Sequence, residues 1–192
     1  MKKFGYFGGS FDPVQKGHLI LAAAARRQLK LDEVYFVPAA RSPFKSLHAV
    51  PARHRAAMLG LALQGRRGFS LASWDLKSPG PSYTYKTLSR LRKKQGGDRW
   101  FLIIGSDSYQ RFKRWRRWRE ILRHHTVAVG RRPGFKGTDL PRDAQGQVLF
   151  LKGSFPPVSS TEIRRRLKKG LSVGPLTPPA VSAYIRRRGL YR

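Results

Sequence analysis

The chain has 192 residues, 40% of them hydrophobic, and its 40 lysines and arginines against 10 aspartates and glutamates give a formal net charge of +30. Cysteine is absent from the sequence, which excludes disulfides, thiolate nucleophiles and cysteine-ligated metals. No apolar run approaches the roughly 20 residues of a membrane helix, and the N-terminus lacks the features of a signal peptide, so we expect a cytoplasmic protein without a membrane span.

The excess of positive charge predicts an affinity for polyanions such as nucleotides, nucleic acids or acidic surfaces. The basic residues are spread along the chain instead of being gathered in a tail, which favours a generally basic surface over a dedicated nucleic-acid arm. The length and the hydrophobic content suffice for one well-packed domain and are short for two, so we expect a single domain over residues 1–192.

Short apolar runs alternate with helical patterns along the chain. The apolar runs predict strands over residues 3–7, 34–38, 69–74, 100–104, 126–129 and 148–151. The helical patterns predict helices over residues 17–29, 51–63, 84–94, 161–168 and 180–188. Because the strands are apolar throughout, this alternation predicts an α/β fold, in which a Rossmann-like, doubly wound, mostly parallel sheet is covered by helices on both faces.

Signals of helix ends accompany these patterns. Pro51 suits the first turn of the second predicted helix. His124 and His125 close a helix before the strand at 126–129, at a place where the helix dipole favours a cation. We assign neither of these histidines to the chemistry, and we treat His48 and His54 in the same way.

A phosphate-binding turn is predicted at the end of the first strand. Gly8 and Gly9 lie there, and without a Cβ atom they let a phosphate approach the backbone closely. The helix that begins near Gly17 directs unsatisfied N–H groups toward the same place, and His18 in its first turn can donate to a phosphate oxygen. The turn contains no Gly-x-Gly-x-x-Gly pattern, and the chain contains no Gly-Lys pair, so a P-loop is excluded.

A second phosphate signature lies near the C-terminus. Ser159, Ser160 and Thr161, followed by Glu162, are typical of a helix N-terminus, with hydroxyls for capping and a carboxylate in the first turn. The same hydroxyls and free N–H groups can hold phosphates, and Arg164 adds a bidentate donor one turn later. The pairing of this segment with the first turn favours a phosphate-binding function over a simple helix cap.

Together these motifs resemble those of the nucleotidyltransferase superfamily, and further landmarks resemble bacterial nicotinate-nucleotide adenylyltransferases. The landmarks are Ser42-Pro43-Phe44-Lys45, Ser82-Tyr83-Thr84-Tyr85-Lys86-Thr87-Leu88, Ile104-Gly105-Ser106-Asp107, Trp115 and Arg131-Arg132-Pro133-Gly134. In that family the 5′-phosphate of nicotinate mononucleotide attacks the α-phosphorus of ATP in line, usually with Mg²⁺, and pyrophosphate leaves. The resemblance therefore implies adenylyl transfer by positioning and charge stabilisation, in the biosynthesis of NAD.

The resemblance also implies roles for individual residues. The implied catalytic residues are Gln15, His18 and Arg164. The implied ATP-binding residues are Gly8, Gly9, Ser10, Phe11, Gly17, Gly105, Asp107, Ser159, Ser160 and Thr161. The implied residues for nicotinate mononucleotide are Lys45, Thr84, Trp115, Arg116 and Arg131. Residues 160–192 are expected to form a helical segment that completes the ATP site, and no protein ligands for a metal are implied.

The chain departs from the family pattern at Gln15, which replaces the first histidine of a His-x-Gly-His motif, and at Phe44, where histidine is usual. Arg116 also stands where an aromatic residue is common. These departures leave phosphopantetheine or nicotinamide-mononucleotide adenylyl transfer as alternative activities. A diverged basic scaffold that binds RNA or another polyanion is an alternative of a different class. The oligomeric state is not predicted by the sequence.

Overall fold

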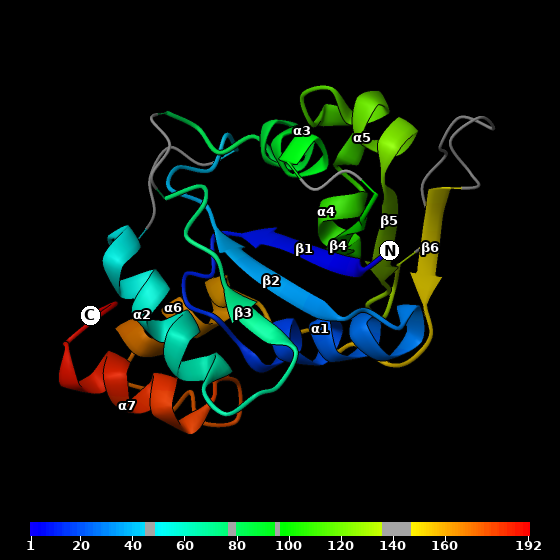
Figure 1. Ribbon diagram of the computed structural model, residues 1–192. Helices are drawn as coiled ribbons and strands as arrows, with labels where there is room; N and C mark the ends of the chain where they lie inside the picture. The colour runs from blue at the N-terminus through cyan, green and yellow to red at the C-terminus, as the bar shows by residue number, and fades with distance from the viewer. Residues whose placement is uncertain (45–48, 77–79, 95–96, 136–146) are drawn as a thin grey trace.

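The computed structural model describes residues 1–44, 49–76, 80–94, 97–135 and 147–192 (Figure 1). The strands are β1 (Lys3–Gly9), β2 (Glu33–Pro38), β3 (Phe69–Leu71), β4 (Arg99–Gly105), β5 (Thr126–Gly130) and β6 (Val148–Leu151). The helices are α1 (Lys16–Leu29), α2 (Ala52–Leu63), α3 (Thr84–Lys94), α4 (Ser106–Tyr109), the 3₁₀ turn η1 (Phe112–Arg114), α5 (Trp118–His124), α6 (Ser160–Lys168) and α7 (Pro179–Arg187).

Across the described ranges, the strands form one 6-stranded sheet in the order β3-β2-β1-β4-β5-β6, and each neighbouring pair is parallel. The chain runs outward from β1 through β2 to β3 and then returns to the other side of β1 as β4. The strand order therefore reverses between β1 and β4. In open parallel sheets ligands bind beside the carboxyl ends of the strands at such a point, because the flanking helices cross to opposite faces there.

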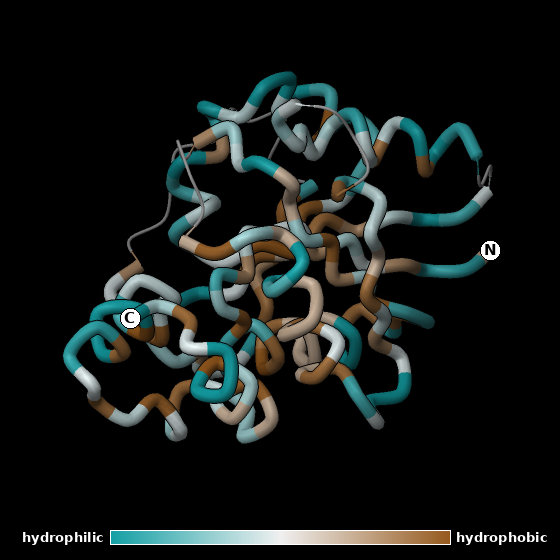
Figure 2. The backbone as a smooth tube through the Cα atoms, turned by 90° about the vertical axis from the view of Figure 1, so that its left-hand side faces the viewer, coloured by the Kyte–Doolittle hydropathy of each residue, from teal (hydrophilic) through white to brown (hydrophobic). Residues whose placement is uncertain are grey.

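Two apolar layers bury the sheet on both faces, as expected for apolar strands. On one face α1, α2 and α7 pack against the sheet, with contributions from Leu21, Ala25, Met58, Leu59, Val181 and Ile185. On the other face α3 and α5 supply Leu88, Leu91, Ile121 and Leu122. Figure 1 shows α1 and α7 below the sheet and α3 and α5 above it. In Figure 2 the hydrophobic segments gather in the middle of the molecule and the hydrophilic ones at its rim.

The predicted α/β class and its parallel sheet are confirmed, and the element bounds agree closely with the structure. The third strand is shorter than predicted and ends at Leu71, because Trp74 turns away to pack on Tyr35 and Trp100. Pro51 precedes α2 as its N-cap instead of lying in its first turn. None of the helices in the described ranges has the length and apolar character needed to span a bilayer.

His125 lies at a helix end where the dipole favours a cation, but its ring is not charged at neutral pH. His125 is the C-cap of α5, and its side chain is 8% exposed. Burial lowers the pKa of His125 to about 4, so the imidazole is neutral at neutral pH despite the favourable helix dipole. The desolvation of the cation thus outweighs its attraction to the end of the helix.

Candidate active site

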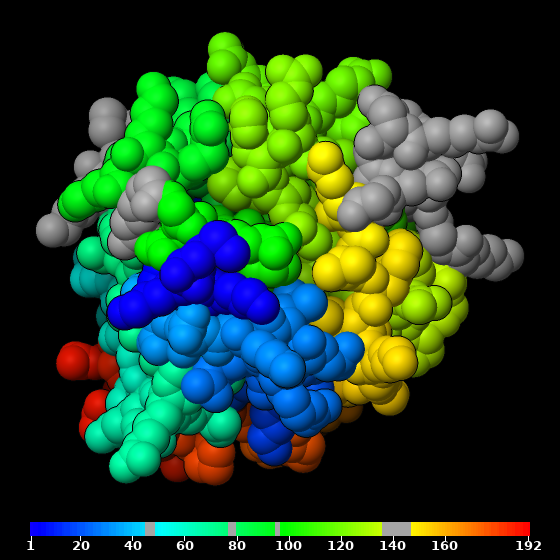
Figure 3. Space-filling view, turned by 45° about the vertical axis from the view of Figure 1, so that its right-hand side comes forward, coloured from blue at the N-terminus to red at the C-terminus, as the bar shows by residue number. Residues whose placement is uncertain are grey.

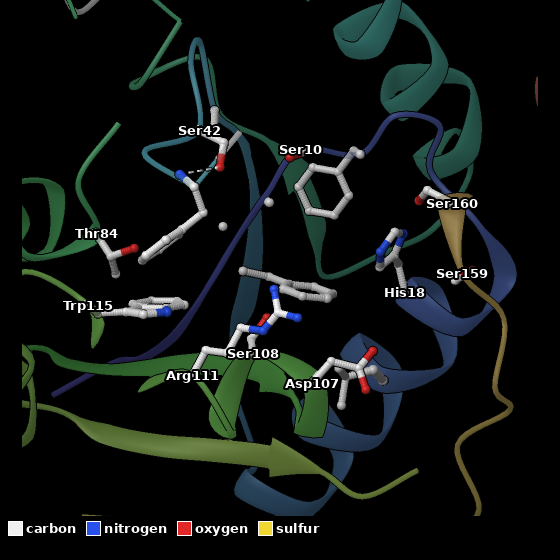
Figure 4. Close-up of a pocket in the computed structure, with 18 of the residues that line it drawn as sticks. Ser10, His18, Ser42, Thr84, Asp107, Ser108, Arg111, Trp115, Ser159 and Ser160 are labelled. Carbon is white, nitrogen blue, oxygen red and sulfur yellow. Dashed lines mark hydrogen bonds between the residues drawn. The ribbon is translucent and has the colours of Figure 1, made fainter. Parts of the chain in front are cut away.

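A pocket of about 890 Å³ opens at the carboxyl ends of β1 and β4. Gly8 and Gly9 at the end of β1 and Gly105 at the end of β4 form its floor, together with Gly130 at the end of β5. Figure 4 shows His18, Ser159 and Ser160 at one end of the pocket and Thr84 and Trp115 at the other. The pocket therefore has two ends with different chemistry, one rich in hydroxyl and imidazole groups and the other aromatic.

The first turn of α1 fixes the orientation of His18. Gln15 caps the helix: its Oε1 accepts from the backbone N–H of His18 at 3.2 Å, and its own N–H donates to His18 Nδ1 at 3.2 Å. Because Nδ1 is the acceptor, the neutral ring carries its proton on Nε2. The side-chain amide of Gln15 also donates to the carbonyl of Val158 at 2.8 Å, and the Gln15 side chain is buried. Gln15 thus joins α1 to the segment that precedes α6.

A network behind the pocket holds the turn between β1 and α1. The guanidinium of Arg55, which is buried, donates to the carbonyls of Ser10 at 2.9 Å and Ala39 at 2.7 Å. Burial lowers the pKa of Arg55, and the nearby Asp12 carboxylate opposes this change. Tyr191, close to the C-terminus, donates its hydroxyl to Asp12 Oδ1 at 2.7 Å. The turn is therefore anchored by side chains from α2 and from the end of the chain.

The start of α6 closes the pocket from the C-terminal side. Ser159 caps α6 by accepting from the N–H of Glu162 at 3.1 Å, and the Ser160 hydroxyl donates to the carbonyl of Pro13 at 2.8 Å. Arg164 donates to the carbonyl of Asp12 at 2.7 Å. Hydrogen bonds from Arg165 and then Arg166 lower the pKa of Glu162 to about 2, so this carboxylate is ionised at the helix N-terminus. The second predicted signature is thus joined directly to the first.

The aromatic end of the pocket is built by the segment that follows β2, by the start of α3 and by the segment around η1. Trp115 lies 6.4 Å from Phe44 and 5.3 Å from Phe112 between ring centroids. Thr84 begins α3, and the guanidinium of Arg116 lies 5.3 Å from the centre of the Tyr83 ring. Trp115 and Phe44 present aromatic surface to the pocket, which suits a planar heterocycle.

A buried acid lies under this end. Asp75 is 4% exposed and accepts from the hydroxyls of Thr87 at 2.6 Å and Tyr6 at 3.3 Å. Burial raises the pKa of Asp75, and it also raises the pKa of Tyr6. A Cβ atom at Gly8 would lie 2.7 Å from the Tyr6 ring, so glycine is required there for the strand to pass over this ring. The network thus sets the position of the pocket floor.

The rim beside β4 carries an ion pair between Asp107 and Arg132. Arg132 also donates to the carbonyl of Val158 at 3.2 Å, which links the end of β5 to the segment before α6. The neighbouring Arg131 points elsewhere, and its guanidinium lies 4.8 Å from the centre of the Phe150 ring. Of the two neighbouring arginines, Arg132 therefore lines the pocket and Arg131 does not.

Most predicted site residues meet in this pocket. The pocket is lined by the predicted residues Gly8, Gly9, Ser10, Phe11, Gln15, Gly17, His18, Thr84, Gly105, Asp107, Trp115, Arg116, Ser159, Ser160 and Thr161. Among the described lining residues, Arg164 and Arg131 do not appear, because the first is bonded to the turn and the second packs on Phe150. Lys45 lies outside the described residues.

Sequence reasoning missed part of the lining and its support. The lining residues to which no role was assigned include Tyr6, Ser42, Asp75, Ser108, Arg111, Arg114 and Arg132. Behind the lining it missed Arg55 and Tyr191, which have no local motif. Ser42 and Arg132 are exceptions, because both stand inside quoted landmarks. Over the described part of the chain, no group of three or more histidine, aspartate or glutamate side chains is placed to hold a metal ion.

Comparisons with known proteins agree with this arrangement. The model of the cytidylyltransferase-like family matches residues 6–166. The chain is 40% identical to a probable nicotinate-nucleotide adenylyltransferase of Thermus thermophilus, over 99% of this chain and 100% of that protein. It is 38% identical to a probable nicotinate-nucleotide adenylyltransferase of Methylibium petroleiphilum, over 99% of this chain and 92% of that protein.

A solved structure shares the fold. It is that of Plasmodium falciparum nicotinic acid mononucleotide adenylyltransferase complexed with NaAD, with a TM-score of 0.80 over 100% of this chain and 98% of that one. Its sequence identity is 20%, so this similarity bears on the fold alone. The similarity to the bacterial relatives extends over the full length of the chain and therefore establishes the family. The chain belongs to the nicotinate-nucleotide adenylyltransferases, within the cytidylyltransferase-like family.

Proposed function

We propose that the protein transfers the adenylyl group of ATP to nicotinate mononucleotide, giving deamido-NAD and pyrophosphate in NAD biosynthesis. An oxygen of the mononucleotide 5′-phosphate forms a bond to the α-phosphorus of ATP, and the bond from that phosphorus to the bridging oxygen of pyrophosphate breaks. No covalent intermediate with the protein is required. The observation that carries the proposal is one pocket whose two ends suit a triphosphate and an aromatic ring.

The end of the pocket with His18 suits the ATP phosphates. His18 Nε2–H would donate to the α-phosphate, where negative charge develops in the transition state. The N-terminus of α6, with Ser160 and Thr161, offers hydroxyls and N–H groups for the β- and γ-phosphates. The hydrogen bonds of Gln15 to His18 and Val158 support a positioning role for this residue, in place of a direct contact with phosphate.

The C-terminal segment contributes to the same site in this proposal. Arg164 would act by holding the turn through the carbonyl of Asp12. Together with the contact of Ser160 to Pro13, this bond joins the two phosphate signatures across the sequence. Residues 160–192 would therefore complete the ATP site as part of a single domain.

The aromatic end of the pocket suits the pyridine ring. Trp115 would stack on the ring, and Thr84 would lie at its edge. Arg116, Arg111 and Arg114 surround this end with positive charge, which favours the carboxylate of nicotinate over the neutral amide of nicotinamide. Asp107, paired with Arg132, would meet the nucleotide sugars between the two ends.

Mg²⁺ enters this proposal as the counter-ion of the ATP phosphates. The described residues offer no cluster of carboxylates and histidines that fits a resident metal, so we derive no step through a protein-held ion. The remaining charge on the phosphates would be met by His18 and the helix N-termini. A cytoplasmic location is part of the proposal, because ATP is the substrate.

Replacement of His18 tests the role of the phosphate end. His18→Ala should lower kcat by about 100- to 1000-fold, the usual cost of removing one donor to developing charge. His54→Ala is the matched control, because His54 bonds to Tyr184 Oη at 2.9 Å and does not line the pocket. Pyrophosphate release is measured with saturating ATP, Mg²⁺ and nicotinate mononucleotide. Equal rates for the two variants would contradict the role of His18.

A further inference from the structure

A basic groove lies outside the pocket, between α3 and the start of α5. It has a volume of about 620 Å³, and it is lined by Tyr85, Lys86, Ser89, Arg90, Arg92, Lys93, Lys94, Arg117 and Glu120. Figure 3 shows α3 (green) and the segment after β4 (yellow-green) side by side along the top of the molecule. None of the groove residues just named appears among those lining the active-site pocket. The groove is therefore a separate feature of the surface.

The charges of the groove are poorly balanced. Its lysines and arginines are exposed, and the carboxylate among its described lining residues is that of Glu120. Glu120 is already engaged by Arg117 at 3.3 Å and by the Ser89 hydroxyl at 3.3 Å. The groove therefore presents a concentrated positive field, with a carboxylate that is held at one side.

The arrangement of these cations works against the stability of α3. Lys86, Arg90 and Lys94 stand four residues apart on one face of the helix, a spacing at which like charges repel. The negative C-terminal end of the α3 dipole favours Arg92, Lys93 and Lys94. The positive N-terminal end disfavours Lys86, which lies in the first turn. The repulsion among Lys86, Arg90 and Lys94 therefore opposes helix formation, and an anion bound along this face would offset it.

Arg117, on the other wall of the groove, has a strained backbone conformation. It precedes α5 with a φ of 55°, a left-handed conformation that glycine or asparagine adopts more easily. Its guanidinium lies over the Tyr85 ring at 5.1 Å and lines the groove. The chain therefore keeps an arginine at a strained backbone position, where its guanidinium lines the groove beside Tyr85 and Glu120.

The aromatic side chains near the groove indicate which kind of nucleic acid it would bind. The Tyr83 ring is flanked by Lys86 at 5.8 Å and by Arg116 at 5.3 Å, and Tyr85 is covered by Arg117. Proteins that bind single strands stack bases on exposed rings, which these covered rings do not offer. Contacts to the phosphate backbone alone are typical of binding to a duplex without sequence preference.

We propose that the α3–α5 groove binds the phosphate backbone of double-stranded nucleic acid, as a function separate from adenylyl transfer. The lysines and arginines on α3 contact successive phosphates, and Arg117 contributes from the opposite wall. Binding of this kind depends on the release of counter-ions, so it weakens steeply as the salt concentration rises. RNA and DNA duplexes present the same phosphodiester chemistry, and separate arms of the experiment distinguish them.

The test compares two triple variants with the same change of charge. Arg92→Gln, Lys93→Gln and Lys94→Gln neutralise the last turn of α3 in the groove. Arg186→Gln, Arg187→Gln and Arg188→Gln neutralise the end of α7, on the opposite side of the sheet (Figure 1). Fluorescence anisotropy with labelled RNA and DNA duplexes of one sequence gives the Kd of each protein between about 50 and 200 mM salt.

The wild type should bind one or both duplexes with a Kd near the micromolar range at physiological salt. The α3 variant should lower the slope of log K against log salt by about 2.7 and weaken binding roughly a hundredfold, whereas the α7 variant should stay close to wild type. Equal losses in both variants would reveal a diffuse effect of net charge and would overturn the proposal, as would a wild type that binds neither duplex. Adenylyl transfer should be unchanged in the α3 variant, whose three residues do not line the active-site pocket, and this separates the test from that of the proposed function.

Discussion

The hydroxyl of Tyr191 should stabilise the fold by holding the turn between β1 and α1. Tyr191→Phe removes the donor at 2.7 Å from Asp12 Oδ1, in a place where Tyr191 is 7% and Asp12 is 3% exposed. A hydrogen bond to a charged group contributes about 1.5 to 3 kcal/mol, so the free energy of unfolding should fall by about 2 kcal/mol. In a chain of this size that loss lowers Tm by about 4 to 8 °C.

Urea unfolding of the purified protein measures this change. Tyr184→Phe is the matched control, because its hydroxyl meets the ring of His54 at 2.9 Å in a partly exposed place, where the loss of the hydrogen bond should cost about 1 kcal/mol or less. Equal losses in the two variants would refute the special role of Tyr191.

The same variant has a signature in the pH dependence. Burial, and then the charge of Asp12, raises the pKa of Tyr191 well above the usual value of 10.0. The unfolded chain releases this proton above about pH 10 and the folded chain retains it, so the stabilisation is present below that pH and is lost as the pH rises. The wild type should lose about 1.4 kcal/mol more per pH unit than Tyr191→Phe in that range. Parallel curves would contradict the buried contact to Asp12.

Further predictions concern the pocket floor, the aromatic end of the pocket and the stability at acid pH. Gly8→Ala places a Cβ atom 2.7 Å from the buried Tyr6 ring and should destabilise the fold by about 1 to 3 kcal/mol in urea unfolding. Gly60→Ala, in the same assay, should stabilise the fold by about 1 kcal/mol, because Gly60 lies in α2 with open space around it. Trp115→Ala should raise the KM for nicotinate mononucleotide by about tenfold through the loss of stacking, and an unchanged KM in steady-state assays would contradict that role. The pKa of His125 is lowered to about 4, so protonation of the unfolded chain should cost about 3 kcal/mol of stability as the pH falls from 6.5 to 4, and His125→Leu should flatten this limb of the stability curve.

The elements of the fold were predictable because the buried strands are apolar on both faces and are separated by clear helical patterns. The prediction failed where an apolar run had another use. The apolar run that ends in Trp74 predicts a strand, but Trp74 belongs to an aromatic cluster with Tyr35 and Trp100. At His125 a rule about helix ends was outweighed by burial, which no local pattern reveals.

The candidate site was predictable where contiguous residues do the work. Phosphate recognition at helix N-termini uses neighbouring backbone groups and hydroxyls, so His18 and Ser160 stand in recognisable motifs. The supporting side chains come from far along the chain. Arg55 reaches Ser10 and Tyr191 reaches Asp12 only in the folded molecule, and one arginine among 40 lysines and arginines carries no signal of its own.

The departure at Gln15 is explained by the same logic. Its amide accepts from the N–H of His18 and donates to Val158, so a neutral side chain suffices for the contacts made at this position. His18, whose ring is oriented by the backbone N–H of Gln15, would then be the residue that donates to the α-phosphate. This arrangement is compatible with an active enzyme that lacks the first histidine of the motif.

A substrate panel tests the central claim most directly. The protein is supplied with ATP, Mg²⁺ and either nicotinate mononucleotide, nicotinamide mononucleotide or phosphopantetheine, and pyrophosphate release gives kcat/KM for each. We expect the highest kcat/KM for nicotinate mononucleotide, with deamido-NAD as the product. The absence of product from saturating nicotinate mononucleotide, or a higher kcat/KM for either other acceptor, would contradict the proposed function.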